Sequence, residues 1–235
     1  MTAVLRRRDT RRRGELRRLV VGLLLWGAAL AVLPARAAAP GLARRPGLAV
    51  TPGEERFDAA FRKYSKRFFG PAQDWREFKA QGLTESNLDT LARSYVGARG
   101  VMQLMPTTFH EVTSRNPEIQ RLIDDPEWNI AAGISYDRRL WLQWAQDSVS
   151  DHRREFMFAS YNAGRGTLLM AQRMARAESL DHRAWPSIEQ VAPQMRRWRY
   201  RETLEYLRRI DRHLESMDEQ GRVRSPSLTA PARRP

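Results

Sequence analysis

Hydrophobic positions between residues 55 and 217 recur with the spacing of an α-helix. Phe57, Phe61, Tyr64 and Phe68 are separated by four, three and four residues, which places them on one helix face. The same period returns along the rest of this region. No stretch of useful length alternates apolar and polar residues as a β-strand would. The pattern therefore predicts an all-α domain.

Capping residues and helix breakers divide this region into seven or eight helices. Proline is tolerated in the first turn of a helix, and short polar side chains cap helix starts. Asn129 is expected to cap the fourth helix, and Ser187 with Gln190 to form a capping box on the seventh. The expected helices begin at or near Phe57, Trp75, Pro106, Asn129, Phe156, Gly166, Ser187 and Arg199.

The fourth expected helix places a carboxylic acid among apolar residues. Ile130, Ile134, Asp137, Trp141 and Trp144 share one face. Six of the seven tryptophans of the chain lie within the helical region, and most of them are expected to pack in its core.

The first 37 residues are typical of an export signal. Residues 1–18 are rich in arginine, residues 19–33 are an unbroken apolar run, and Ala35–Ala39 supply the small residues of a cleavage site. We expect cleavage after Ala37 or Ala39, and a location in the periplasm or cell envelope. The alternative is an uncleaved segment that attaches the chain to the membrane.

Two flanking segments lack any hydrophobic period. Residues 38–54 contain the pairs Pro40-Gly41, Pro46-Gly47 and Pro52-Gly53 and are expected to be a linker. Residues 218–235 are polar and proline-containing and are expected to be a disordered tail. The folded domain is therefore predicted to span residues 55–217.

The strong positive charge lies mainly in the flanking segments. The formal net charge of the chain is +14, of which residues 1–37 carry +7 and residues 221–235 carry +4, so that about +3 remains between them. A nucleic-acid-binding domain usually concentrates its charge on a folded face. The distribution therefore disfavours nucleic acid as a partner, and a mildly basic surface still suits an anionic polymer.

Several chemistries have no candidate residues. The chain has no cysteine, which excludes disulfides, cysteine-based zinc sites, a cysteine nucleophile and a lipid-modified N-terminal cysteine. Its four histidines are scattered without the spacing of metal ligands, and no nucleotide-binding loop occurs. We expect no metal and no cofactor.

Three segments carry candidate catalytic residues: Gln81–Ser86, Ser94–Pro106 and Tyr161–Gly164. Glu85 ends an apolar-lined helix, where the negative end of the helix dipole and burial would both raise its pKa. A general acid at neutral pH needs such a shift. Each segment also has a simpler interpretation: a surface glutamate, a buried Gln103 bonded to backbone, and an ordinary helix end at Gly164.

Taken together, the segments resemble the soluble lytic transglycosylase (SLT) family, which has a lysozyme-like helical fold. The family motifs are a Glu-Ser step, a Gly-Ala-x-Gly segment leading to Met-Gln-x-Met-Pro, an Asn-Ile-x-x-Gly segment and Ala-x-Tyr-Asn-x-Gly. This chain matches them in order at Glu85-Ser86, Gly97–Pro106, Asn129–Gly133 and Ala159–Gly164. Glu202-Thr203 followed by Tyr206 resembles a late family element, and Phe78–Gly82 resembles the membrane-bound F-type branch.

The resemblance implies a role for each matched residue. Glu85 would be the catalytic acid and base. Tyr161 would face its carboxyl group, and Asn162 would support the site. The residues expected to shape the cleft and contact the sugar are Ser94, Gln103, Met105 and, late in the chain, Glu202.

The resemblance also implies the reaction. Glu85 would protonate the oxygen of the MurNAc–GlcNAc β-1,4 bond in peptidoglycan glycan strands. It would then take the proton of the 6-hydroxyl of the same muramic sugar, whose oxygen attacks C1 to leave a 1,6-anhydromuramoyl end. No water is consumed, so one carboxyl group suffices where most glycosidases need two.

Two alternative functions remain open. A goose-type lysozyme-like hydrolase would need a second carboxylate to activate water, and Asp89 is the candidate, although an aspartate there is more often a loop cap. A catalytically inactive module that only binds the cell wall is the other alternative.

Overall fold

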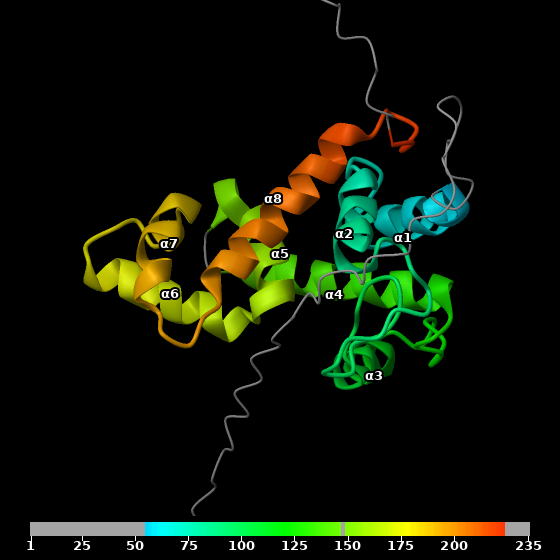
Figure 1. The fold of residues 1–235 in the computed structure, drawn as a ribbon, viewed down its shortest axis with the longest axis horizontal. Coiled ribbons are helices and arrows are strands. Elements are labelled where there is room, and N and C mark those ends of the chain that lie inside the picture. Colours follow the sequence, from blue (N-terminus) through cyan, green and yellow to red (C-terminus); the bar gives the residue numbers. More distant parts are fainter. Residues whose placement is uncertain (1–54, 147–148, 224–235) are drawn as a thin grey trace, which may run out of the picture.

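The computed structural model describes residues 55–146 and 149–223, which contain eight α-helices and no β-strand (Figure 1). The prediction of an all-α fold with seven or eight helices is confirmed. The predicted signal segment, the linker and residues 224–235 lie outside the described residues. The helices are α1 (Asp58–Phe69), α2 (Arg76–Ser86), α3 (Pro106–Arg115), α4 (Pro126–Gln146), α5 (Arg153–Ala163), α6 (Arg165–Ala177), α7 (Trp185–Val191) and α8 (Tyr200–Ser216).

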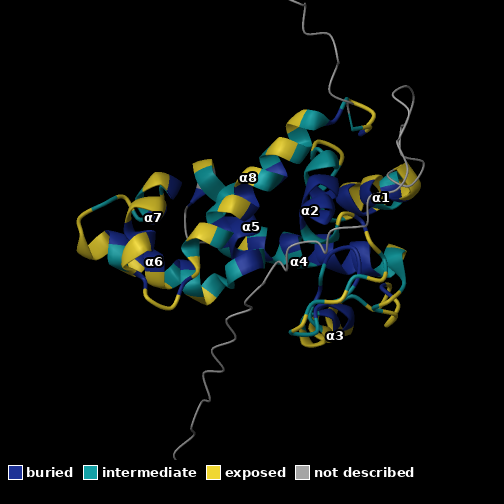
Figure 2. Cartoon of the chain, in the orientation of Figure 1, coloured by how far each residue is buried: buried dark blue, intermediate teal, exposed yellow. Residues whose placement is uncertain are grey.

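The 21-residue helix α4 is the centre of the packing. It contacts α1, α3 and α5, while α5 also contacts α6 and α8. Helix α8 packs against α2, as Figure 1 shows. The buried residues concentrate where α2, α4 and α5 face one another (Figure 2). Two segments that are far apart in sequence, α2 and α8, are thereby held side by side.

Aromatic rings fill much of the core. The Phe78 ring lies 4.9 Å from that of Phe69 and 6.4 Å from that of Phe158, which joins α1, α2 and α5. Phe156 packs against Trp144 and Trp185 at centroid distances of 4.8 and 5.4 Å. Large rings bury enough apolar surface to fix the helices to one another.

Three predicted helix starts are wrong, and one of them is that of α5, which begins at Arg153 instead of Phe156. Helix α4 begins at Pro126, and its cap is Asp125, whose Oδ1 accepts a hydrogen bond from the Trp128 amide (3.1 Å). Asn129 lies inside the first turn and is fully buried, because its amide bonds to a neighbouring loop instead. Helix α7 begins at Trp185 without a side-chain cap, and proline in its first turn sets the start before Ser187.

The predicted boundary at residue 217 is also corrected. Residues 218–223 fold back over the start of α2, where the buried Lys79 ammonium donates to the Gly221 carbonyl (2.7 Å) and Arg76 donates to the Asp218 carbonyl (3.1 Å). Met217 and Val223 form an isolated antiparallel bridge. Polar composition predicted disorder here, but these backbone carbonyls find buried or half-buried cations.

No helix among the described residues is both long and apolar enough to cross a membrane.

Gly221→Ala should destabilise the fold. Gly221 has φ +83°, and a Cβ there would overlap the Trp75 ring. Left-handed strain and overpacking together should lower the free energy of unfolding by about 2 kcal/mol or more. Urea denaturation measures this. Gly166→Ala is the matched control, since its Cβ would meet open space on a helix. Equal stabilities of the two variants would contradict the packing of this segment.

Candidate active site

Glu85 occupies the last turn of α2. The helix ends there because Asn87 and Leu88 adopt the left-handed conformation, with φ of 56° and 59°. The Glu85 side chain is partly buried, and its Oε1 accepts a hydrogen bond of 2.7 Å from the Tyr206 hydroxyl on α8. The contact joins residues 121 positions apart in the chain. The packing of α2 against α8 therefore sets the position of this carboxyl group.

Burial has the largest effect on the pKa of the Glu85 carboxyl group. It raises the pKa of this carboxyl from 4.5 to about 8, against the opposing effects of the Tyr206 hydrogen bond and the positive charge of Arg209. Arg209 is held close by its own hydrogen bond to the Thr84 carbonyl (2.9 Å). At neutral pH the group is therefore largely protonated, and a cation lies near enough to stabilise its anion. Those are the two states that an acid and then a base must occupy.

Tyr161, on α5, lies near the Glu85 carboxyl group. Its hydroxyl donates to the Met102 carbonyl (2.7 Å), and its ring lies 5.2 Å from that of Tyr136. Burial raises the pKa of Tyr161 well above its usual value, and the charge of Glu85 raises it further. The Tyr161 hydroxyl therefore lies within electrostatic range of Glu85, and the phenol stays neutral.

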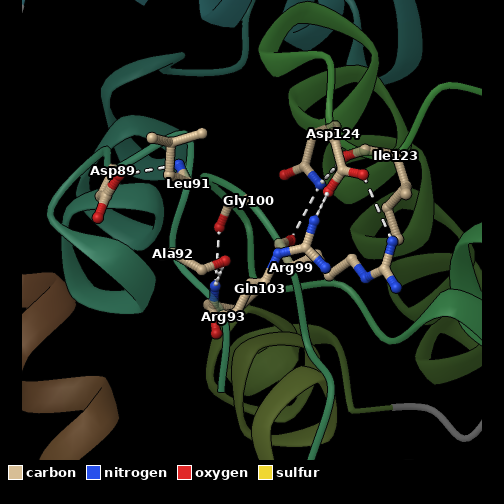
Figure 3. A network of polar contacts seen from close by, with 10 residues as sticks. Asp89, Leu91, Ala92, Arg93, Arg99, Gly100, Gln103, Ile123 and Asp124 are labelled. Atoms are coloured by element: carbon tan, nitrogen blue, oxygen red, sulfur yellow. Dashed lines mark hydrogen bonds and ion pairs between the residues drawn. The ribbon is translucent and has the colours of Figure 1, made fainter. Parts of the chain in front are cut away.

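The segment after Glu85 is held by many polar contacts (Figure 3). The Ser94 hydroxyl accepts the Ala98 amide (2.9 Å). The Gln103 side chain is partly buried, and its amide nitrogen donates to the carbonyls of Ala92 (3.2 Å) and Gly100 (3.0 Å). These bonds stabilise a left-handed backbone at Gln103, with φ of 44°. Met105 ends the segment as the partly buried residue before α3.

Asn129 fastens this loop to α4. Its Oδ1 accepts the Met102 amide (2.8 Å), and its Nδ2 donates to the carbonyls of Arg99 and Ile123 (3.0 Å each). Gly100 is required beneath it, because a Cβ there would lie 2.7 Å from the Asn129 amide nitrogen and φ is +73°. The loop that follows Glu85 is therefore rigid at its base.

Asn162, near the end of α5, and Glu202, in the first turn of α8, lie where these two helices meet. The Asn162 Oδ1 accepts the hydroxyl of Thr203 (2.9 Å), which itself accepts the Trp198 indole N–H (3.0 Å). Glu202 forms an ion pair with Arg199 (3.1 Å), and neither carboxylate oxygen accepts a hydrogen bond within the described residues. Burial raises the pKa of Glu202, against the charge of Arg199. No hydrogen bond or ion pair joins either residue to Glu85 in the described part of the chain.

Asp89, the candidate second carboxylate, caps a turn. It is exposed, and its Oδ1 accepts the Leu91 amide (2.8 Å), as Figure 3 shows. Within the described residues, no group of three His, Asp or Glu side chains is placed to hold a metal ion.

A family model described as the transglycosylase SLT domain matches residues 65–183, about half of the chain. The chain belongs to this family. This match confirms the family membership that the sequence motifs predicted.

Curated relatives agree with the family. Membrane-bound lytic murein transglycosylase F of Vibrio cholerae is 34% identical over 146 residues, which cover 62% of this chain and 25% of that protein. The protein of the same name from Photobacterium profundum is 31% identical over 174 residues, 69% of this chain and 32% of that protein. The SLT chain therefore spans between a quarter and a third of the length of these relatives.

Among solved structures, the 70 kDa soluble lytic transglycosylase of Escherichia coli matches with a TM-score of 0.44 and 20% identity. The match covers 72% of this chain and 26% of that one.

Two residues that lie close to Glu85 were not predicted as functional from the sequence, and a third, buried acid lies near them. Tyr206 and Arg209 act on Glu85 from α8, and the fully buried Asp137 on α4 lies in the same cluster. Tyr206 had a signal, since it belongs to the late motif with Glu202. Asp137 had one too, as the only acid on an apolar helix face. Arg209 had none among the many arginines of α8.

The raised pKa of Glu85 makes stability depend on pH. Between pH 4.5 and about 8 the folded state binds a proton that the unfolded state releases. The Glu85 contribution to stability should therefore fall as pH rises through this window and level off above it. Urea denaturation across this range should show the wild type losing stability relative to Glu85→Gln. A constant difference between the two proteins would mean that Glu85 has no raised pKa.

Proposed function

We propose that this chain is a peptidoglycan lytic transglycosylase that acts in the cell envelope and leaves 1,6-anhydromuramoyl ends. The observation that carries the proposal is the partly buried Glu85 carboxyl with its raised pKa and its Tyr206 partner. Membership of the SLT family and the printed names of the relatives support the substrate class.

The reaction uses Glu85 twice. Tyr206 occupies Oε1, which leaves Oε2 to hold the proton and give it to the glycosidic oxygen as the C1–O bond breaks. The N-acetyl group of the muramic sugar stabilises the cation. The Glu85 carboxylate, stabilised by Tyr206 and Arg209, then takes the proton of the 6-hydroxyl as O6 bonds to C1. Protons balance, and the enzyme returns to its starting state.

The other matched residues position the sugar in this proposal. Tyr161 keeps a neutral hydroxyl beside the reacting carboxyl, and Asn162 holds the start of α8 through Thr203. Glu202, which is paired with Arg199 (3.1 Å), is assigned to the same sugar-binding role by its match to the late family motif. Ser94, Gln103 and Met105 lie in the loop between α2 and α3, and in this proposal the loop shapes the sugar-binding site. We also propose that residues 1–37 direct export, with or without cleavage.

Product analysis tests the reaction. Digestion of purified cell-wall sacculi by the wild-type protein should release muropeptides with 1,6-anhydro ends, identified by mass spectrometry. Glu85→Gln should reduce this release by at least about 10²-fold, because the amide cannot donate the proton. Reducing ends without anhydro product would reject a transglycosylase, and an inert wild type that still binds sacculi would indicate a wall-binding module.

Asp89→Asn separates the transglycosylase from a two-carboxylate hydrolase. Asparagine keeps the oxygen that accepts the Leu91 amide, so the turn should survive. The variant should retain most of the wild-type rate of anhydro-product formation, measured on the same sacculi. A loss as large as that of Glu85→Gln, in a protein of unchanged thermal stability, would favour the hydrolase.

A further inference from the structure

A second carboxyl group lies in the Glu85 cluster and takes no part in the proposed reaction. Asp137 on α4 is fully buried, and its Oδ1 accepts a hydrogen bond of 3.3 Å from the Gln81 amide nitrogen. Gln81 is also fully buried, and it precedes Glu85 by four residues on α2. Side chains four apart share one face of a helix, so the Gln81–Asp137 pair lies one turn from Glu85.

If Asp137 is ionised, one oxygen atom of each residue in this pair has no hydrogen-bond partner. Asp137 Oδ2 and Gln81 Oε1 are both buried acceptors without a hydrogen bond among the described residues. A buried unpaired polar atom is costly, and two acceptors cannot satisfy each other without a proton between them. A carboxylic acid and a primary amide are complementary, since each offers one donor and one acceptor. A proton on Asp137 Oδ2 would turn this acceptor into a donor, which is what the unpaired Gln81 Oε1 requires.

The surroundings favour that proton. The charges that act on Asp137 among the described residues are those of Glu85 and Glu77 on α2, and both are acids. The phenols of Tyr161 on α5 and Tyr206 on α8 face the same cluster. Arg154 on α5 is already paired with Glu77 (3.2 Å) and Asp211 (2.9 Å). Burial, with these acids, raises the pKa of Asp137 well above its usual value.

We propose that Asp137 is a positioning residue that stays protonated and forms a neutral acid–amide pair with Gln81, so that Glu85 ionises without a second negative charge beside it. The inference rests on the proposed function for its catalytic meaning. During the second half of the reaction Glu85 must exist as an anion. An ionised Asp137 would repel that anion and hold Glu85 in its protonated form.

Asparagine at 137 tests the charge without removing the pair. In Asp137→Asn the new amide can accept from Gln81 Nε2 and donate to Gln81 Oε1, so the contacts of the neutral pair are reproduced. We expect the anhydro-product rate and its pH profile to match those of the wild type. A shift of the profile to lower pH by about one unit or more would show that Asp137 is normally an anion, and would overturn the proposal.

Leucine at 137 has the same branching and number of side-chain heavy atoms as aspartate, is larger, and removes the hydrogen bonds. Asp137→Leu leaves the buried Gln81 amide unpaired and should lower both the melting temperature and the product rate. The exchanged double variant, Gln81→Glu with Asp137→Asn, places the acid on α2 and the amide on α4. It should recover the melting temperature lost in Asp137→Leu. Failure of the exchange, with a stable Asp137→Leu protein, would show that the pair has no structural role.

Infrared spectroscopy reports the proton directly. The difference spectrum between the wild type and Asp137→Asn at neutral pH should contain the C=O stretch of a protonated carboxylic acid. A carboxylate band in its place would refute the neutral pair even if anhydro product forms. A wild type that makes no anhydro product but shows the acid band would refute the proposed function and leave the pair intact. The two failures are thereby distinguishable.

Discussion

The hydrogen bond between the Tyr206 hydroxyl and the Glu85 carboxyl is the contact on which the site depends. It joins the end of α2 to the middle of α8, and the same pair of helices is joined again by Arg209 and the Thr84 carbonyl. The contact has two opposite electrostatic consequences. Closing α8 over α2 desolvates the carboxyl and raises its pKa, while the phenol and the guanidinium limit that rise. The pKa of Glu85 is thereby left at about 8, so that this carboxyl group can both give and accept a proton near neutral pH.

Much of the remaining fold holds these two helices in register. Arg154 on α5 links Glu77 on α2 with Asp211 on α8. The segment after α8 returns to α2 and covers the buried Lys79, which also pairs with Asp58 of α1 (2.7 Å). A buried cation of this kind is tolerated because both a carboxylate and a backbone carbonyl compensate its desolvation. The polar end of the domain is thus part of its support rather than a free tail.

The loop after Glu85 is also held in place by contacts within the domain. Its backbone adopts left-handed conformations at several positions, which cost free energy unless neighbouring contacts compensate. Asn129 from α4 and the Gln103 amide supply those contacts from within the domain. Gln103, which the family motif suggests for substrate contact, therefore also supports the backbone of this loop.

The sequence by itself determined the helical class, the number of helices and the identity of Glu85 as the candidate acid. These follow from local period, from turn residues and from ordered motifs, all of which are encoded in neighbouring positions. It misplaced the start of α4 and the end of the domain, because Asn129 and residues 218–223 find partners that are distant in the chain. It misplaced the start of α7 because Pro186 belongs to the first turn of that helix. Only the tertiary structure decided that Tyr206 and Arg209 tune Glu85 and that Asp137 meets Gln81. Desolvation and hydrogen bonding depend on what surrounds a group in space, and a linear pattern does not contain that information.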